Sequence, residues 1–297
     1  MGMKDIQLFV SVYKDHADSA GKVTFPVSAG AALYGEGDPV LSLRDDTGEN
    51  ISASNPQYCE LTVQYWAWKN RSFDVGGLMH QRRYFDLSRV FPVQHGKKPS
   101  SSRPYRIFDV PDEKTVSRLG LRCERVSELT DVYPIIAPLR ENIYQSVRDY
   151  YNRNDRQKHD DISLLLQIIG NSCPEYLESA QRYFSESYAY FCNMMIMDRK
   201  QFCSYSQWLF SVLAQYDRMK PKELFYPREQ GKLAERLFGV YMTYILSETD
   251  IPCAEAPRAH FCRLGGATPD NASFNKKLYA LCPPGSRRRG ILRRLKK

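Results

Sequence analysis

Two adjoining stretches decide the fold: RDDTGENISASNPQYCELTVQYWAWKN, residues 44–70, and FDVGGLMHQRRYF, residues 73–85. They place paired acids, a capped aromatic helix, a short apolar strand and a His-Arg-Arg cluster one after another, with little between them. A purely structural segment has no need of so many ionisable groups beside predicted helix and strand ends. A pocket that binds an anionic, hydroxyl-rich ligand does, and the two stretches predict such a pocket.

The first stretch predicts a helix that begins near Asn55. Asn55 is a good N-cap and Pro56 a good first helical residue, because the cap oxygen accepts an orphan amide and proline has no amide to lose. The helix is expected to end at Asn70 and Arg71. Its mostly apolar stripe recurs at helical spacing and consists of Tyr58, Leu61, Thr62, Tyr65 and Trp66.

The second stretch predicts a buried strand from Val75 to Met79, which is too short for a helix. Its two glycines permit close backbone approach. His80, Arg82 and Arg83 therefore follow the carboxyl end of a strand, which is the edge where open α/β sheets bind ligands.

The rest of the chain alternates between strand and helix patterns. Buried strands are expected at Ile6–Tyr13, Val132–Ala137 and Tyr188–Met197. Helices are expected at Pro26–Tyr34, Asn142–Tyr151, His159–Ile169, Tyr176–Glu186, Arg199–Met219 and Lys232–Leu246. Residues 35–54 are rich in Gly, Asp and Ser and are expected to form a ligand-facing loop. This alternation predicts an α/β fold with a mostly parallel central sheet and a helical C-terminal half.

The net charge of +8 is concentrated at the C-terminal end. Seven Arg and Lys residues between Arg287 and Lys297 leave residues 1–286 with a formal charge of only +1. A nucleic-acid-binding domain normally spreads basic residues over a folded face, so we expect no nucleic-acid partner. If the tail is helical, its Ile and Leu residues and its arginines would suit an anionic membrane surface; the alternative is a disordered solubilising tail.

Composition and cysteine usage also indicate the class of protein and its cellular compartment. The 297 residues, 42% of them hydrophobic, suffice for a real core. Of the eight cysteines none forms a C-x-x-C pair, and several lie in apolar runs, as buried cysteines do in a reducing compartment. Cys253, His260 and Cys262 match no zinc spacing. With no signal-peptide pattern and no apolar span, the protein is expected in the cytoplasm, either free or peripheral on the inner face of the membrane.

Five segments resemble a bacterial family of capsular and exopolysaccharide biosynthesis glycosyltransferases, once catalogued as a domain of unknown function. The family carries DDTGDNIS-like, CELTALYWAWKN-like and HYRRYF-like motifs, and the resemblance covers roughly residues 6–246. The matching segments here are Asp45–Ser52, Cys59–Asn70, His80–Phe85, Phe191–Met197 and Gly231–Phe238. Departures are Glu49 for Asp, Gln81 for Tyr and Cys192 for Tyr, of which Gln81 is the one expected to alter a ligand contact.

The resemblance implies a GT-A-like nucleotide-sugar fold and transfer of a hexose from a UDP-sugar. Galactose or galactofuranose is the expected sugar, and a lipid-linked oligosaccharide of capsule, exopolysaccharide or O-antigen the expected acceptor. The expected organisation is a glycosyltransferase domain at 1–250, an extension at 251–285 and a basic tail at 286–297. Donor-binding residues are expected to be Asp45, Asp46, Asn50, His80, Arg82, Arg83 and Asn193.

Most of these residues also have an alternative, purely structural interpretation. Asp45 and Asp46 would bind sugar hydroxyls, or Mn²⁺ or Mg²⁺ if the reaction needs a metal; otherwise they cap their own turn. Arg82 and Arg83 suit a diphosphate because guanidinium forks bind phosphate oxygens bidentately, and a salt bridge is the alternative. His80 would otherwise be a core histidine, and Asn193 would find a backbone partner.

An inverting transfer needs a carboxylate that deprotonates the acceptor. Glu235 is the first candidate and Asp46 the second; on periodicity alone, Glu235 is a solvated helix acid opposite Leu233 and Leu237. Two other functions stay open at this point. One is a sugar-binding homologue that has lost catalysis, and the other is nucleic-acid binding through the tail.

Overall fold

The computed structural model describes residues 4–13, 23–34, 43–94, 96–99, 103–154 and 160–262, together with Cys282 and Arg288. The expected basic tail therefore lies outside the described residues except for Arg288, which is exposed. So do residues 35–42 of the loop expected at residues 35–54.

The described residues form an 11-stranded sheet and a 2-stranded one. The larger sheet contains β1 (Ile6–Val12), β2 (Thr24–Ser28), β3 (Leu43–Arg44), β4 (Val75–His80), β5 (Arg83–Phe85), β6 (Phe91–Pro92), β7 (Tyr105–Phe108), β8 (Ile135–Pro138), β11 (Met195–Asp198), β12 (Cys253–Ala256) and β13 (Arg258–Phe261). The smaller sheet pairs β9 (Glu141–Asn142) with β10 (Tyr188–Ala189).

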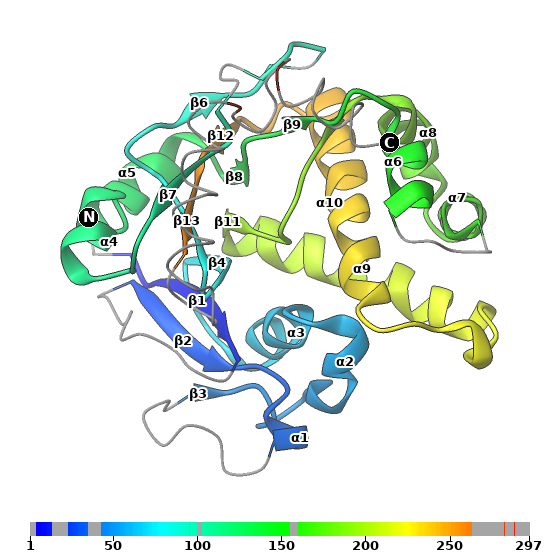
Figure 1. Ribbon diagram of the computed structural model, residues 1–297, viewed down its shortest axis with the longest axis horizontal. Coiled ribbons are helices and arrows are strands. Elements are labelled where there is room, and N and C mark those ends of the chain that lie inside the picture. The colour runs from blue at the N-terminus through cyan, green and yellow to red at the C-terminus, as the bar shows by residue number, and fades with distance from the viewer. Residues whose placement is uncertain are drawn as a thin grey trace.

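The helices follow the strands in alternation, which confirms the predicted α/β class. They are α1 (Ala31–Tyr34), α2 (Asn55–Tyr58), α3 (Leu61–Asn70), α4 (Glu113–Arg118), α5 (Cys123–Val132), α6 (Val147–Asn154), α7 (Asp161–Ser172), α8 (Leu177–Ser185), α9 (Arg199–Met219) and α10 (Glu229–Glu248). The last five helices gather on one side and form a helical half, as expected (Figure 1).

The centre of the sheet has the order β3-β2-β1-β4-β11-β8-β12-β6. The run from β3 to β4 is parallel, and β12 is parallel to β8. β11 lies antiparallel between β4 and β8. The parallel run brings the carboxyl ends of β1 and β4 to the same edge, because Ser11 pairs with His80.

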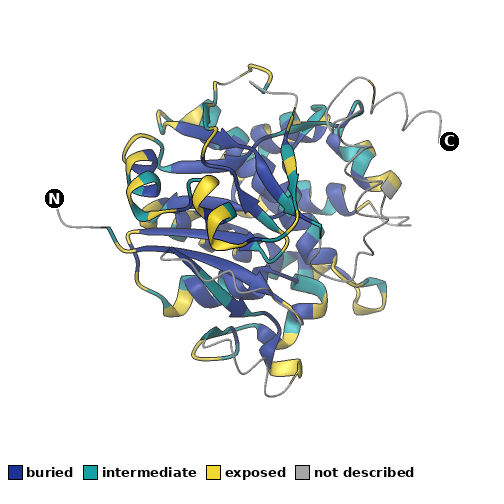
Figure 2. Ribbon diagram, turned by 60° about the vertical axis from the view of Figure 1, so that its left-hand side comes forward, coloured by how far each residue is buried: buried dark blue, intermediate teal, exposed yellow. Residues whose placement is uncertain are grey.

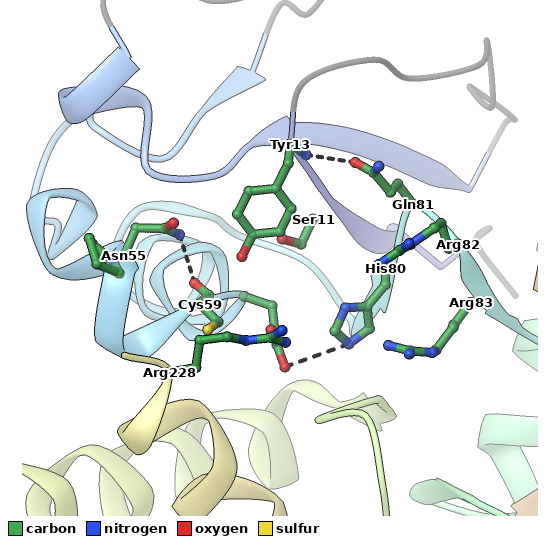
Figure 3. A pocket seen from close by; sticks show the side chains of 11 residues that line it. Ser11, Tyr13, Asn55, Cys59, His80, Gln81, Arg82, Arg83 and Arg228 are labelled. Carbon is green, nitrogen blue, oxygen red and sulfur yellow. Dashed lines mark hydrogen bonds and ion pairs between the residues drawn. The ribbon is translucent and has the colours of Figure 1, made fainter. Parts of the chain in front are cut away.

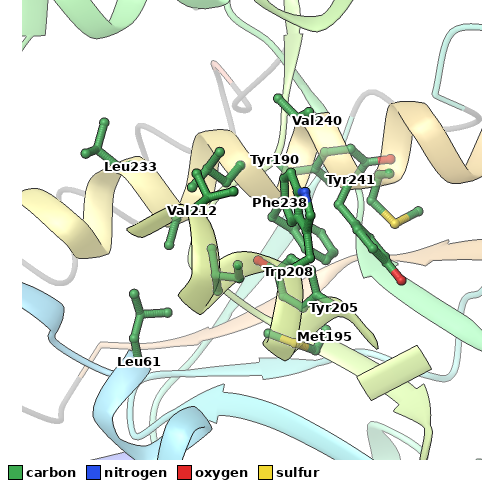
Figure 4. Packing of buried hydrophobic residues seen from close by; sticks show 14 of the residues in the cluster. Leu61, Tyr190, Met195, Tyr205, Trp208, Val212, Leu233, Phe238, Val240 and Tyr241 are labelled. Atoms are coloured by element: carbon green, nitrogen blue, oxygen red, sulfur yellow. The ribbon is translucent and has the colours of Figure 1, made fainter. Parts of the chain in front are cut away.

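Helices cover both faces of the sheet (Figure 1). All seven residues of β1 are buried, with Phe9 in the core under α3 and α9, and Leu8 and Val10 in the core under α4 and α5. Burial on both faces explains why this strand is an apolar run rather than an alternating one (Figure 2). The larger core joins the sheet to α9 and α10, where Tyr205 contacts Phe238 and Tyr241 edge-on or tilted (Figure 4).

The helix predicted at Pro26–Tyr34 is wrong. Residues 24–28 form β2, and only Ala31–Tyr34 is helical. Thr24, Phe25 and Val27 favour extended backbone, and pairing with β1 buries Val27. The fixed φ of Pro26 also suits an extended chain.

Two predicted elements are interrupted by residues with left-handed backbone. The helix expected from Asn55 divides into α2 and α3 at Cys59, whose φ is 53°. Ser54 rather than Asn55 is its N-cap, and the Asn55 side chain instead donates to the Cys59 carbonyl oxygen at 2.9 Å. The strand expected at Tyr188–Met197 divides into β10 and β11 at Cys192 and Asn193.

Two strands follow α10 and complete the sheet. β12 pairs with β8, and β13 pairs with β5 and β7. The extension expected at residues 251–285 therefore begins inside the central sheet. Within the described residues, no helix has both the length and the apolar character that a membrane crossing requires.

Candidate active site

A pocket of about 420 Å³ opens at the carboxyl edge of β1 and β4. Its walls come from segments far apart in the sequence: the two strand ends, the α2–α3 junction and the residue before α10 (Figure 3). The residues that line it are Ser11, Tyr13, Asn55, Pro56, Cys59, Glu60, His80, Gln81, Arg82, Arg83 and Arg228. The structure thus brings together three of the predicted donor-binding residues, His80, Arg82 and Arg83.

Gln81 fastens the two strand ends to each other. Its amide donates to the Ser11 carbonyl oxygen at 3.0 Å, and its side-chain oxygen accepts from the Tyr13 amide at 2.7 Å. The departure from the family's tyrosine therefore lies in the pocket wall, where it fixes the backbone that carries Tyr13.

The pocket is strongly cationic. Arg82 and Arg83 follow β4, and Arg228 stands before α10 with a left-handed φ of 65°. The guanidinium groups of Arg83 and Arg228 point into the same space beside His80 (Figure 3). Burial, together with the charges of Arg83 and Arg228, lowers the pKa of Arg82. Within the described parts of the chain, none of the three lies at ion-pair distance from a carboxylate, so their charge is available to an anionic ligand.

Glu60 is the one carboxylate among the described residues that line the pocket. It is 5% exposed, and its Oε1 accepts from the Asn193 side-chain amide at 2.7 Å. His80 Nε2 lies 3.7 Å from the same oxygen. Burial lowers the pKa of His80, so this ring is neutral at neutral pH and the contact is not an ion pair.

Cys59 adjoins Glu60 in the pocket wall. Burial, assisted by the Glu60 charge, raises the pKa of its thiol to about 11. The thiol therefore stays protonated and unreactive at neutral pH. None of the eight cysteines, all of which the structure describes, takes part in a disulfide.

Cys192 and Asn193 form a strained turn directly behind Glu60. Their φ values are 81° and 42°, which non-glycine residues rarely adopt. The Cys192 amide donates to Glu235 Oε1 at 2.7 Å, and its carbonyl oxygen contacts His80 Nε2. The side-chain Nδ2 of Asn193 also donates to the Gly231 carbonyl oxygen at 2.8 Å.

Glu235 supports this turn and is not among the residues that line the pocket. Its side chain is 21% exposed, and its Oε2 accepts from Arg236 at 2.8 Å. Burial raises its pKa, against the opposing effect of Arg236. The expectation of a solvated helix acid is wrong, because the Cys192–Asn193 turn covers this part of α10.

The paired acids of the first motif lie elsewhere. Asp45 is fully buried and accepts from the amides of Gly30 and Ala31 at 2.8 and 3.0 Å, and from Ser52 Oγ at 2.5 Å. Asp46 is held by two hydrogen bonds from Arg44, which lower its pKa. Neither acid lines the pocket.

Asn50 bonds within its own turn. It donates to the Gly48 carbonyl oxygen at 2.9 Å and accepts from the Ser52 amide at 3.2 Å. Of the described residues, no group of three or more His, Cys, Asp or Glu side chains is arranged to hold a metal ion.

Sequence reasoning missed Tyr13, Glu60 and Arg228. Tyr13 directly follows a buried strand, and Glu60 is an acid inside a family-like motif, so both carried a signal. Arg228 carried none, because its place depends on how the loop before α10 folds back to bond the Pro56 carbonyl oxygen at 2.8 Å.

Comparison with known proteins places the chain in a family. The family model described as a domain of unknown function (DUF4422) matches residues 7–246. The apo structure of the bifunctional glycosyltransferase WbbM is similar, with a TM-score of 0.77 and 26% identity, which shows a GT-A-like fold. That match covers 88% of this chain and 46% of the other, so this chain spans about half of its length. No curated protein matches. Because the family model covers most of the chain, the protein belongs to the DUF4422 family.

Proposed function

We propose that this protein is a glycosyltransferase that takes a hexose from a nucleoside diphosphate sugar. One observation carries the proposal: Arg82, Arg83 and Arg228 surround a pocket at the carboxyl edge of parallel strands. Guanidinium forks match phosphate oxygens, and this edge is the usual ligand position in open α/β sheets. The similarity to a glycosyltransferase over 88% of the chain supports the same reading.

The arginines would act on the leaving group. As the bond between sugar and diphosphate breaks, negative charge grows on the diphosphate, and fixed cations stabilise that charge more than the ground state. Tyr13 offers a flat apolar face with a hydroxyl at the same rim, which suits a nucleoside base.

The finer assignment rests on the family resemblance. The proposed donor is UDP-galactose or UDP-galactofuranose, and the proposed acceptor is a lipid-linked oligosaccharide of capsule, exopolysaccharide or O-antigen. The basic tail at residues 286–297 would hold the enzyme on an anionic inner membrane surface. Truncation after Ser286 should abolish co-sedimentation with phosphatidylglycerol vesicles; unchanged co-sedimentation would reject this role.

Ligand-induced thermal stabilisation tests the donor site. UDP, UDP-galactose and GDP-mannose are compared, each with Mn²⁺ and with EDTA. A ligand at 100 times its dissociation constant stabilises by about 2.7 kcal/mol. Stabilisation by UDP that survives EDTA would support binding through arginines alone, whereas stabilisation that needs Mn²⁺ would mean that a metal ion binds together with the diphosphate.

Substitutions of the pocket arginines test whether UDP binds at this site. Arg83→Ala should weaken UDP binding by about 10- to 100-fold, since a hydrogen bond to a charged group contributes roughly 1.5–3 kcal/mol. Arg83→Lys should be intermediate, because it keeps the charge and loses the fork. The matched control is Arg118→Ala, an exposed residue at the end of α4. No stabilisation of the wild-type protein by any nucleotide would reject the proposed function.

A further inference from the structure

We propose that Glu60 is the catalytic base of this site, a role that rests on the proposed transfer reaction. Its carboxylate lines the pocket beside the three arginines, whereas Glu235 and Asp46 do not. A group that takes a proton from a bound acceptor must lie within hydrogen-bond reach of it. Only a residue in the pocket wall meets that condition.

Among the described residues, the Glu60 side chain accepts a single hydrogen bond. Glu60 stands at the N-cap position of α3, yet its side chain makes no capping hydrogen bond. His80, its nearest basic neighbour, is neutral and 3.7 Å away. Asn193 occupies Oε1, and among the described residues no donor is bonded to Oε2. A buried carboxylate with one oxygen held and one unused fits a proton acceptor better than a structural acid.

The Cys192–Asn193 turn positions this carboxylate. Glu235, His80 and the Gly231 carbonyl oxygen hold the turn, and Asn193 in turn holds Glu60. Left-handed non-glycine residues persist only where surrounding contacts enforce them, and they concentrate at functional sites. Glu235, which the family-like segment singled out, thus acts as a positioning residue through this turn.

The proposed step is a direct displacement. The acceptor oxygen forms a bond to the anomeric carbon, and its proton passes to Glu60 Oε2. The bond between that carbon and the diphosphate oxygen breaks, and its electron pair leaves with the diphosphate beside Arg83 and Arg228. Such a displacement inverts the anomeric configuration, so the stereochemistry of the product is part of the test.

The experiment compares Glu60→Gln with the wild-type protein. The assay follows UDP release from UDP-galactose and UDP-galactofuranose, with n-octyl galactoside as the acceptor probe. The kcat of Glu60→Gln should fall by about 10²- to 10⁴-fold, while the thermal shift produced by UDP stays that of the wild-type protein. Glu128→Gln, an exposed acid on α5, is the matched control and should keep full activity.

Two further variants separate catalysis from structure. Formate should restore part of the activity of Glu60→Ala, which a purely structural loss would not allow. Asn193→Ala should lower kcat with little change in the donor KM, because it removes the hydrogen bond that orients Glu60.

The outcomes distinguish this proposal from the proposed function. If the wild-type protein turns over a donor and Glu60→Gln keeps kcat within about tenfold, the role of Glu60 is wrong and the transferase stands. A raised KM with unchanged kcat, or retention of configuration, also overturns the catalytic base. If the wild-type protein binds UDP without turnover, both the transfer reaction and the role of Glu60 are rejected.

Discussion

At the scale of single residues, His260 shows how the cationic pocket affects its surroundings. Its ring stacks on Tyr105 with centroids 4.0 Å apart and an interplanar angle of 2°. Burial, the largest cause, and four neighbouring basic groups hold the pKa of His260 well below its usual 6.5. These groups are Arg258, Arg83, His80 and Arg82. The ring is therefore neutral in the folded protein across the physiological range.

Acid should accordingly destabilise the protein through His260. The unfolded chain binds a proton at this residue below about pH 6.5 and the folded chain does not, so the free energy of unfolding falls as the pH drops. At one pH unit below that value, the free energy of unfolding is lower by about 1.4 kcal/mol through this residue. His260→Phe keeps the stack and cannot bind a proton, so its urea midpoint should fall less between pH 7.5 and 5.5 than that of the wild-type protein. Equal pH slopes would show that His260 titrates normally.

The two glutamates of the site mark the limit of residue-level prediction. Helical periodicity predicted a solvated face for Glu235, because it considers only the residues of that helix and no contacts from other segments. The turn that covers it comes from a segment about forty residues away in sequence, and no local pattern reports that contact. The sequence could have indicated Glu60, because it is an acidic residue inside a distinctive motif. Its approach to His80 depends on the packing of α3 against the sheet.

At the scale of elements, α8 and α10 pack with almost no space between them. Gly239 of α10 lies under the Tyr183 ring of α8, and a Cβ added there would lie 1.9 Å from Tyr183 Cζ. Tyr183 is 1% exposed, and its hydroxyl accepts from the Tyr190 amide at 3.3 Å. The ring therefore has no free direction in which to move.

Gly239→Ala should destabilise the protein even though alanine favours helix. The propensity gain is at most about 1 kcal/mol, whereas the forced shift of a buried ring costs roughly 1–3 kcal/mol or more. Gly170→Ala in α7 is the matched control, since its nearest contact would be an ordinary 3.5 Å to Leu177. Chemical denaturation should show a lower midpoint for Gly239→Ala and an equal or higher one for Gly170→Ala. An equal rise of the denaturation midpoint in both variants would mean that Tyr183 can move aside.

Elements with one clear periodicity were predictable, and those with special backbone were not. The helix Arg199–Met219 matches its expected bounds, because its apolar face recurs at helical spacing along its whole length. Asp198 caps its start through a side-chain hydrogen bond. The interruptions at Cys59 and Cys192 were missed, since nothing in a cysteine side chain signals a left-handed φ. Asn193 is of a residue type that tolerates this conformation, but tolerance alone does not predict it. Tertiary contacts enforce these conformations, so a window of sequence cannot report them.

At the scale of the whole molecule, a buried polar cluster joins the helical half to the pocket. Lys220 donates to Asp161 of α7 at 2.8 Å and also contacts Glu229, the first residue of α10. Tyr216 of α9 donates to the same Asp161 oxygen at 2.7 Å. Glu229 follows Arg228 directly, so the cluster fixes the place from which this arginine enters the pocket.

Removal of the cation should therefore affect both stability and binding. In Lys220→Met, two buried carboxylates lose their counter-charge, and breaking a buried pair in this way costs about 3–5 kcal/mol. The midpoint of urea unfolding should fall accordingly, while Lys222→Met, an exposed lysine two residues away, should change it little. Because Glu229 would lose this contact and directly follows Arg228, UDP binding by the folded fraction should also weaken. A Lys220→Met protein that keeps wild-type stability would mean that Asp161 and Glu229 do not depend on this cation. Unaltered UDP affinity would mean that the hydrogen bond from the Arg228 amide to Pro56 suffices to position Arg228.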